Sequence, residues 1–255
     1  MKYSNYFTRS ALFSLMVGAS LLSGCSGLPQ KQANELPAQH SYDSVVHEDT
    51  VYAIDVYDPW EGFNRGVYRF NAGFDQYVFL PVVGAYETVL PDVVEDSVSN
   101  FFNNLFEITN FANSALQLKP NDSAKTAGRF VINSTAGIVG LFDVATGMGF
   151  YENKEDFGQT LGHYGVGEGP YVILPFLGPS NLRDATGTIV DAAIMSSIDV
   201  LDLDDNSGRE VAYYALQAID ARHKKGFRYY QTGSPFEYEL VRKLYTDKRK
   251  LDISR

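Results

Sequence analysis

Glycine-rich and acidic segments are the places where this sequence could hold a ligand or carry out chemistry. Gly165, Gly167 and Gly169 stand two positions apart, but the third glycine of a dinucleotide loop and the Gly-Lys-Ser/Thr of a phosphate loop are both absent. The stretch Gly178–Leu182 lacks the closing glycine of a nucleophile elbow. The acidic stretch 202–206 lacks the glycine and the distal glutamate of a calcium loop, so we expect a solvated turn there. These segments predict no nucleotide, nucleophile or calcium site.

The histidines and the cysteine also give no catalytic or metal-binding set. No two of the four histidines lie three or four positions apart, the spacing that places two ligands on one helix face. His163, Ser180 and Asp184 are the residue types of a catalytic triad, but nothing in their spacing favours one. A single cysteine excludes an intrachain disulfide and any metal site built on two cysteines. We therefore predict a protein that is not an enzyme and that needs no cofactor or metal.

Cys25 stands where a bacterial lipoprotein would be acylated. The chain begins with basic residues and no acidic ones, continues with the apolar stretch Ala11–Leu22, and reaches the cysteine through a Ser-Gly pair. These features describe a secretory signal. We predict a signal peptide over residues 1–24 and acyl chains on Cys25, with each buried CH₂ contributing about 0.8 kcal/mol to membrane attachment. The residue after the cysteine is Ser26 and not an aspartate, and in this respect the sequence resembles the lipoproteins that are directed to the outer membrane. The alternative is an ordinary signal peptide that contains a cysteine.

The composition describes an acidic protein with ample material for a core. The chain has 255 residues, of which 21 are basic and 31 acidic, so that its net charge is −10, and 45% are hydrophobic. The negative balance argues against nucleic acid as a partner, because phosphate binding requires a basic surface. No apolar run reaches the roughly 20 residues that cross a bilayer as a helix. Residues 25–54 are polar and contain prolines, so we predict a lipidated, flexible tether there and one domain over residues 55–250.

Helical periodicity recurs along this domain more often than strict alternation, so we predict an all-α fold. Apolar residues from Phe63 to Val78 recur at intervals of three and four, and Pro81 and Pro91 then interrupt the pattern. A long helix is expected from about Asp92 to Leu118, where a proline soon follows. Further helices are expected after three capping segments, namely 121–123, 206–207 and 234–237.

The predicted helix over 92–118 has a polar side that is rich in asparagine but nearly free of charge. Its apolar side includes Phe102, Leu105 and Leu116, which we expect to pack outward against neighbouring helices or lipid. A solvated helix face usually carries lysine and glutamate, which form helices better than asparagine does. The sequence therefore predicts that the polar side lines an enclosed, hydrated channel, with three lining residues: Asn103, Asn110 and Ser114. The alternative is a surface helix with an asparagine-rich outer side.

The glycine-rich segment 137–150 is apolar and contains one charged residue, Asp143. It is too short to cross a bilayer as a helix, but it is long enough for two helical turns, a bend and a return. We predict a hairpin that sits in one leaflet of a membrane, with Ile138, Val139 and Leu141 in hydrocarbon. The alternative is a buried pair of glycine-rich helices.

Longer stretches of the chain resemble a known family. Residues Thr160–Gly187 read TLGHYGVGEGPYVILPFLGPSNLRDATG, and Asp58–Arg65 read DPWEGFNR. Together with Ile219–Arg222 and the C-terminal segment 235–245, they resemble the MlaA (VacJ) family of outer-membrane lipoproteins. The motif residues that carry this resemblance include Gly165, Gly167, Gly169, Pro170, Arg183 and Asp184.

The resemblance implies a function as well as a fold. It implies an all-helical, ring-shaped domain seated in the inner leaflet of the outer membrane, on the periplasmic side, beside a trimeric porin. Mislocalised phospholipids would leave the outer leaflet through an amphipathic channel and pass to a soluble periplasmic carrier of the MlaC type. The alternatives are a lipoprotein that binds a porin without moving lipid and a lipid hydrolase, for which the sequence displays no nucleophile.

Overall fold

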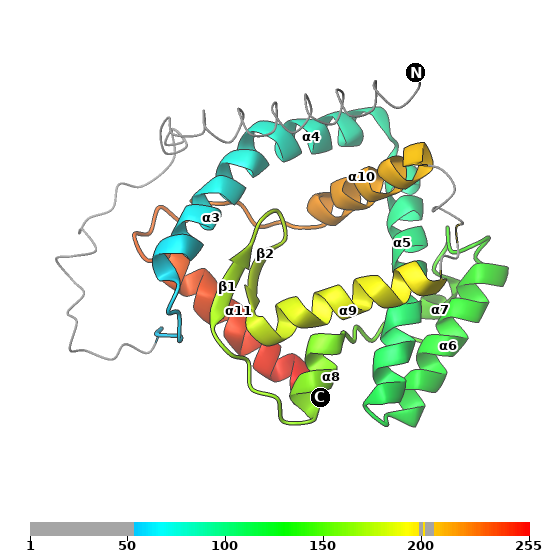
Figure 1. Ribbon diagram of the computed structural model, residues 1–255. Coiled ribbons are helices and arrows are strands. Elements are labelled where there is room, and N and C mark those ends of the chain that lie inside the picture. Colours follow the sequence, from blue (N-terminus) through cyan, green and yellow to red (C-terminus); the bar gives the residue numbers. More distant parts are fainter. Residues whose placement is uncertain (1–53, 199–200, 202–206) are drawn as a thin grey trace, which may run out of the picture. The chain divides into compact units, whose positions relative to one another are not determined.

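Helices dominate the structure, which confirms the all-α fold class (Figure 1). The computed structural model describes residues 54–198, 201 and 207–255. The predicted signal peptide, Cys25, all but the last residue of the predicted tether, and the acidic stretch 202–206 lie outside the described residues. The helical elements, in chain order, are α3 (Glu61–Phe74), the π-helical stretch η1 (Asp75–Phe79), α4 (Leu80–Val89), α5 (Asp92–Leu116), α6 (Pro120–Thr135), α7 (Val144–Gly147), α8 (Phe157–His163), α9 (Leu182–Ile198), α10 (Ser207–His223) and α11 (Glu237–Ile253).

One strand pair interrupts the helices of the described chain. Strands β1 (Tyr171–Leu174) and β2 (Gly178–Asn181) are antiparallel, and Leu174 pairs with Gly178 next to the turn. Both strands fall within the stretch that carries the family resemblance, where the sequence pattern predicts no strand. Strand β1 contacts α3, strand β2 contacts α11, and both strands contact α9, which follows the hairpin directly (Figure 1).

Two asparagines of α3 replace the missing neighbour of β1. The Asn64 amide accepts a hydrogen bond from the Ile173 N–H (2.9 Å) and donates one to the Tyr171 carbonyl (3.1 Å). Asn71, two turns further along α3, makes the corresponding pair of bonds at the end of the strand. A two-stranded ribbon has two open edges, and these amides satisfy the backbone groups of one of them.

Pro81 does not interrupt the first helical arm, contrary to the prediction from the sequence. Helix α3 passes through η1 into α4 without a break, and Pro81 lies in the first turn of α4. The N–H of Leu80 donates to the carbonyl of Asp75, five positions earlier, so the turn before the proline is widened. A wider turn relieves the clash between a proline ring and the carbonyl of the preceding turn. Pro91, in contrast, does separate α4 from α5, as predicted.

No single helix within the described ranges is both long and apolar enough to cross a membrane. The arm Glu61–Val89 and helix α5 together meet the criteria of length and composition, but they are bent by 120° at Pro91.

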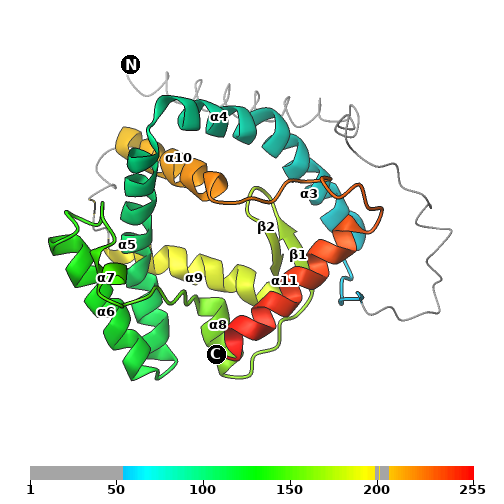
Figure 2. The same cartoon turned by 180° about the vertical axis from the view of Figure 1, so that it is seen from behind.

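Contacts between the elements close into a circuit (Figures 1 and 2). The arm of α3, η1 and α4 packs through α4 against α10, and α10 packs against α5. Helix α5 contacts α9, α9 contacts β1, and β1 returns to α3. Helix α6 packs along α5, and α11 contacts α8 and β2. Each element of the circuit is therefore held by neighbours on two sides.

The hydrophobic core is small and built around tyrosines. Tyr68, Tyr171, Ile173 and Tyr238 form its buried cluster. The Tyr68 ring meets the Tyr238 ring edge to face at 5.8 Å, which is a favourable arrangement for aromatic pairs. The Tyr68 hydroxyl donates to Glu237 (2.7 Å), so this polar atom is satisfied inside the protein. The core thus joins α3, the hairpin and α11.

Candidate functional site

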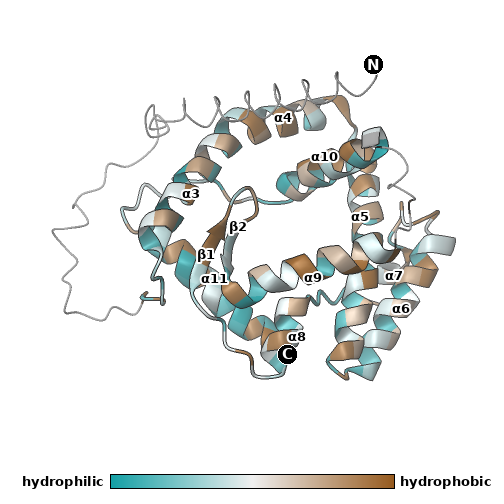
Figure 3. Cartoon of the chain, in the orientation of Figure 1, coloured by the Kyte–Doolittle hydropathy of each residue, from teal (hydrophilic) through white to brown (hydrophobic). Residues whose placement is uncertain are grey.

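Polar side chains fill the interior of the described structure, and large apolar side chains cover much of its surface. Among the described residues, ten hydrophobic side chains are buried, against twenty-eight polar or charged ones. Exposed apolar residues lie along the first arm, along α5 and in the segment after α6, and the hydropathy colouring shows brown patches on these elements (Figure 3). Ordinary water-soluble domains bury mainly aliphatic and aromatic residues. This distribution is inverted.

A buried ion pair joins α5 to α6. The Arg129 guanidinium donates to Glu107 (2.5 Å), and both side chains are almost completely enclosed. Arg129 also reaches Asp143 (3.2 Å) in the segment after α6. Burial opposes ionisation of Asp143, but hydrogen bonds from Thr146 and Asn133, together with Arg129, hold the pKa of this carboxyl below its usual range. Asp143 thereby fixes the loop that follows α6 to the helix itself.

The structure places the three predicted channel-lining residues differently from one another. Asn110 and Ser114 are 5% and 0% exposed, so they lie within packed protein and not on a water-facing surface. The Asn110 carbonyl accepts a hydrogen bond from the Glu155 N–H (3.1 Å), which explains an asparagine at a buried helix position. Asn103 is partly exposed. The structure thus corrects the expectation for two of the three residues.

Helix α5 turns part of its apolar side outward. Phe106, Phe111 and Leu116 are 38%, 44% and 47% exposed. Phe102 and Leu105, by contrast, are buried, and Phe102 contacts the ring of a tyrosine on α10. The asparagine-rich side packs inward because its amides bond to backbone and side chains of neighbouring segments. The helix therefore buries several of its asparagines within the protein, while three large apolar side chains at different points around it are exposed.

The segment after α6 forms an apolar tip, which we define as residues 138–142. The tip itself consists of turns, and the four-residue helix α7 follows it, so the two helical turns expected at the start of this segment are not formed. A side chain at Gly137 would lie 2.2 Å from the Phe142 carbonyl oxygen, because the chain closes tightly on itself at this point. Ile138 and Val139 are 59% and 62% exposed and have positive φ angles of 54° and 58°. Branched side chains rarely adopt this conformation, so the tip holds them outward against their preference.

The glycine–proline segment forms the approach to β1. Gly165 and Gly169 have φ angles of 84° and 68°, a region that favours glycine, whereas Gly167 has no such requirement. The Pro170 carbonyl accepts the N–H of Leu182 (3.0 Å), which ties the segment to the start of α9. These residues serve the turn itself and offer no cradle of N–H groups.

Arg183 and Asp184 belong to a charged cluster that joins α8, α9 and α11. Arg249 donates to Asp184 (2.8 Å) and to Asp156 (2.6 Å). Arg183 lies 2.9 Å from Asp184, and the Tyr245 hydroxyl donates to the same carboxylate (2.8 Å). Burial opposes ionisation of both aspartates, but the bonds from Arg249 outweigh it and hold the pKa of each below its usual range. The motif residues therefore act as a structural clamp.

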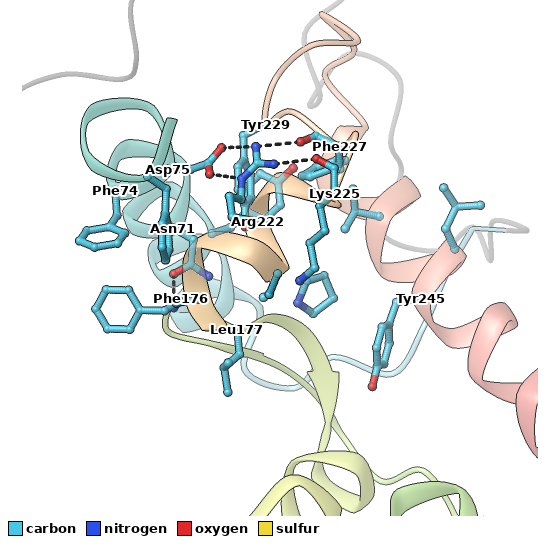
Figure 4. Close-up of a pocket in the computed structure, with 18 of the residues that line it drawn as sticks. Asn71, Phe74, Asp75, Phe176, Leu177, Arg222, Lys225, Phe227, Tyr229 and Tyr245 are labelled. Carbon is cyan, nitrogen blue, oxygen red and sulfur yellow. Dashed lines mark hydrogen bonds and ion pairs between the residues drawn. The ribbon is translucent and has the colours of Figure 1, made fainter. Parts of the chain in front are cut away.

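A cavity of about 480 Å³ lies between α3, the turn of the β-hairpin, the end of α10 and α11 (Figure 4). Most of its lining is apolar, and the aromatic and aliphatic side chains that face it include Phe74, Phe79, Phe176, Leu177, Val241 and Leu244. A volume of this size with mainly apolar walls accommodates part of a lipid-sized molecule. We refer to it below as the hairpin cavity.

A few polar groups stand among these apolar walls. Arg222 holds Asp75 with two nitrogens, one of them at 2.9 Å, and also donates to the carbonyls of Lys225 and Phe227. Figure 4 shows this pair at one end of the cavity and Tyr245 at the other. Burial, together with Asp75, raises the pKa of Tyr229 to about 12, so its hydroxyl stays protonated at neutral pH. The cavity is amphipathic, with an ion pair and hydroxyls at its edges.

The hairpin cavity was not predicted from the sequence, because its lining comes from four separate segments. Arg222, Val241 and Tyr245 fall within the C-terminal pattern of the family resemblance, which is the one signal that pointed to this region. Within the described residues, no group of three or more histidine, cysteine or acidic side chains is placed to hold a metal ion.

Comparison with known proteins shows a family and several relatives that this chain resembles. The family model described as MlaA lipoprotein matches residues 56–252. An uncharacterized protein of Rickettsia prowazekii is 41% identical over 137 residues, which cover 54% of this chain and 55% of that protein. Two proteins named "Intermembrane phospholipid transport system lipoprotein MlaA" also match. The Escherichia coli protein is 42% identical over 139 residues, which cover 52% of this chain and 55% of that protein. The Haemophilus influenzae protein is 32% identical over 181 residues, which cover 70% of this chain and 71% of that protein.

A solved structure is also similar. It is described as "Structural basis for maintenance of bacterial outer membrane lipid asymmetry", with a TM-score of 0.63 and 30% identity. The match covers 78% of this chain and all of the solved chain. The sequence match to the first of the curated relatives spans only about half of their length, 55%.

Proposed function

Since this chain belongs to the MlaA lipoprotein family, we propose that it removes mislocalised phospholipids from the outer leaflet of the outer membrane and passes them to a soluble periplasmic carrier. Its named relatives are intermembrane phospholipid transport lipoproteins, and the similar solved structure concerns outer-membrane lipid asymmetry. The function is transport and requires no covalent chemistry by this chain.

The inverted distribution of polar and apolar side chains is the observation that carries the proposal. An apolar exterior is stable in hydrocarbon, and buried polar groups remain there without water because they are hydrogen-bonded to one another; partly exposed polar side chains such as Asn103 are the partners that a headgroup would meet during passage. Moving a headgroup through hydrocarbon without partners costs several kcal/mol. The closed circuit of contacts among the elements supports a ring-shaped body in the inner leaflet, with the lipid path inside it.

In this proposal the two parts of a phospholipid meet different surfaces. The acyl chains lie against apolar walls such as those of the hairpin cavity, and the headgroup stays beside polar side chains. Asn103, which is partly exposed, faces the path, while the buried Asn110 and Ser114 hold its wall in place. Uncharged amides suit passage because they bind a phosphate weakly enough to release it.

Anchoring and partners complete the proposal. Acyl chains on Cys25 would hold the protein at the periplasmic face of the outer membrane, as the first 25 residues of the sequence suggest. A trimeric porin beside the ring and a soluble carrier that receives the lipid are the partners that the family resemblance implies.

A test of membrane seating uses the apolar tip. Val139→Asp places a charge where we propose hydrocarbon, at a cost of about 2–3 kcal/mol. We expect partition into vesicles to fall roughly 30-fold or more. The measurement is flotation with phospholipid vesicles, using full-length chains that also carry Cys25→Ala so that acylation does not mask the difference. Leu251→Asp, at a 63% exposed position beside the charged Lys250 and Asp252, is the matched control and should float normally. Equal flotation of both variants would show that the tip lies in water.

The rival functions differ in what they predict for purified protein. With vesicles that contain a fluorescent phospholipid and a soluble lipid acceptor, transport predicts faster transfer and intact phospholipid. A hydrolase predicts free fatty acid and lysophospholipid. A structural porin-binding lipoprotein predicts neither, and transfer at the rate of protein-free vesicles would reject the proposed function.

A further inference from the structure

The lining of the hairpin cavity carries an excess of positive charge in a chain whose net charge is −10. Asp75 is the acidic side chain of this lining, and both of its carboxylate oxygens bind Arg222. Lys248 also lines the cavity but pairs with Asp252 on its own helix. Lys225 remains, and within the described part of the chain no acidic side chain lies within ion-pair distance of its ammonium group.

Lys225 lines the cavity while remaining exposed, and no carboxylate of the described residues pairs with its charge. Figure 4 shows its side chain extending away from the Arg222–Asp75 pair into the cavity, on the side of Leu177. Its carbonyl accepts a hydrogen bond from Arg222 (2.7 Å), which fixes the backbone at this position. Loss of hydration and the nearby Arg222 lower the pKa of Lys225, while Asp75 opposes them. An anion that entered the cavity would restore the missing partner of this ammonium.

We propose that Lys225 binds the phosphate of a phospholipid in the hairpin cavity and that the site prefers anionic headgroups to zwitterionic ones. This inference rests on the proposed function and names its substrate class. The apolar walls take the first part of the acyl chains, and the ammonium takes the phosphodiester as a charge-assisted hydrogen bond.

The preference follows from the absence of a free carboxylate in the lining. A zwitterionic headgroup brings a positively charged amine or quaternary ammonium next to its phosphate, and that charge is stabilised by a nearby carboxylate. Asp75 is the acidic group of the lining, and Arg222 already occupies it, so the amine would meet Lys225 and Arg222 instead. Like charges beside apolar walls repel each other more strongly than they do in bulk water. A headgroup that carries the phosphate charge alone avoids this repulsion.

Equilibrium binding of matched lipids to the purified full-length protein in detergent tests the proposal. The probes are fluorescent phosphatidylglycerol and phosphatidylcholine with identical acyl chains. We expect wild-type protein to bind the anionic lipid about tenfold more tightly, and Lys225→Gln to reduce that ratio to near one, while binding of phosphatidylcholine stays within about twofold. Lys225→Arg keeps the charge and should keep the preference. Lys224→Gln removes the neighbouring lysine, which is also exposed but pairs with Asp96 and does not line the cavity, and it should behave as wild type.

Each outcome of the test supports or overturns a separate statement. A ratio near one in wild-type protein, or an unchanged ratio in Lys225→Gln, overturns the role of Lys225 and leaves the proposed function standing. Displacement of phosphatidylglycerol by equimolar inorganic phosphate also overturns it, because the site would then recognise free phosphate and not a lipid. Absence of binding for both lipids rejects the proposed function and this inference together.

Discussion

Replacing Arg249 with methionine is expected to lower the free energy of unfolding by about 3 kcal/mol, because it leaves two carboxylates without their shared cation. Asp184 is 6% exposed, and its carboxylate accepts a hydrogen bond from Arg249 at 2.8 Å, which ties α9 to α11. The cost lies near the low end for a broken buried pair, since Arg183 still faces Asp184. Chemical denaturation of the full chain in mild detergent measures it. Lys250→Met, beside it and 62% exposed, should change stability by less than about 0.5 kcal/mol.

The same cluster predicts how stability depends on pH. The pKa values of Asp156 and Asp184 are lowered in the folded protein, so the unfolded chain binds protons at a higher pH than the folded one. Their contribution is therefore complete above the ordinary aspartate pKa of about 3.9 and is lost as the pH falls toward the lowered folded values. Thermal melting between pH 7 and pH 3 should show a steeper decline below about pH 4 in wild-type protein than in Arg249→Met. Parallel curves would contradict this role of Arg249.

Gly187→Ala is the second change for which we expect a large effect, a loss of about 2–3 kcal/mol. An added Cβ would lie 2.3 Å from the Gly158 nitrogen and 2.8 Å from its Cα. Both neighbours are backbone atoms, so the clash separates α8 from α9 and cannot be relieved by a rotamer change. The measurement is again chemical denaturation.

Gly128→Ala is the matched control for this prediction. Gly128 also lies in a helix, α6, but an added Cβ there meets nothing within 4 Å. Alanine is a better helix former than glycine, so this change should stabilise the protein by about 0.5–1 kcal/mol. If the two variants had the same stability, the close packing of α8 on α9 would be wrong.

Local signals in the sequence were sufficient for most helices. The prolines at positions 91 and 120 bound α5, and its length of 25 residues, Asp92–Leu116, agrees with the prediction to within two residues. Helix α10 likewise begins at Ser207, within the predicted capping segment 206–207. These boundaries depend on residues within one turn of the helix end, which is why periodicity and capping residues locate them.

Features that depend on distant partners were not predictable in the same way. The β-hairpin requires Asn64 and Asn71, roughly a hundred positions earlier in the chain, as hydrogen-bond partners. The orientation of α5 depends on Glu155, whose N–H needs the Asn110 carbonyl. A helical wheel separates the two sides of a helix but does not state which one faces the protein. The usual assumption is that the apolar side of a helix packs inward and its polar side faces water. In a chain with many buried polar side chains, that assumption does not place α5 correctly.

The hairpin cavity shows the same limit of local patterns. Its ion pair joins Asp75 to Arg222 across 147 positions, and no motif relates these two residues. Family resemblance identified Arg222 because it compares whole chains, whereas spacing rules compare neighbours.

Phospholipid in the outer leaflet of the outer membrane is the quantity that tests the central claim most directly. It can be measured by labelling headgroups on intact cells, or by an outer-leaflet phospholipase, in the native bacterium with and without this gene. We predict that deletion raises outer-leaflet phospholipid and that the wild-type gene restores the normal level. Val139→Asp should restore it poorly, and Leu251→Asp fully. An unchanged level in the deletion strain would contradict the account.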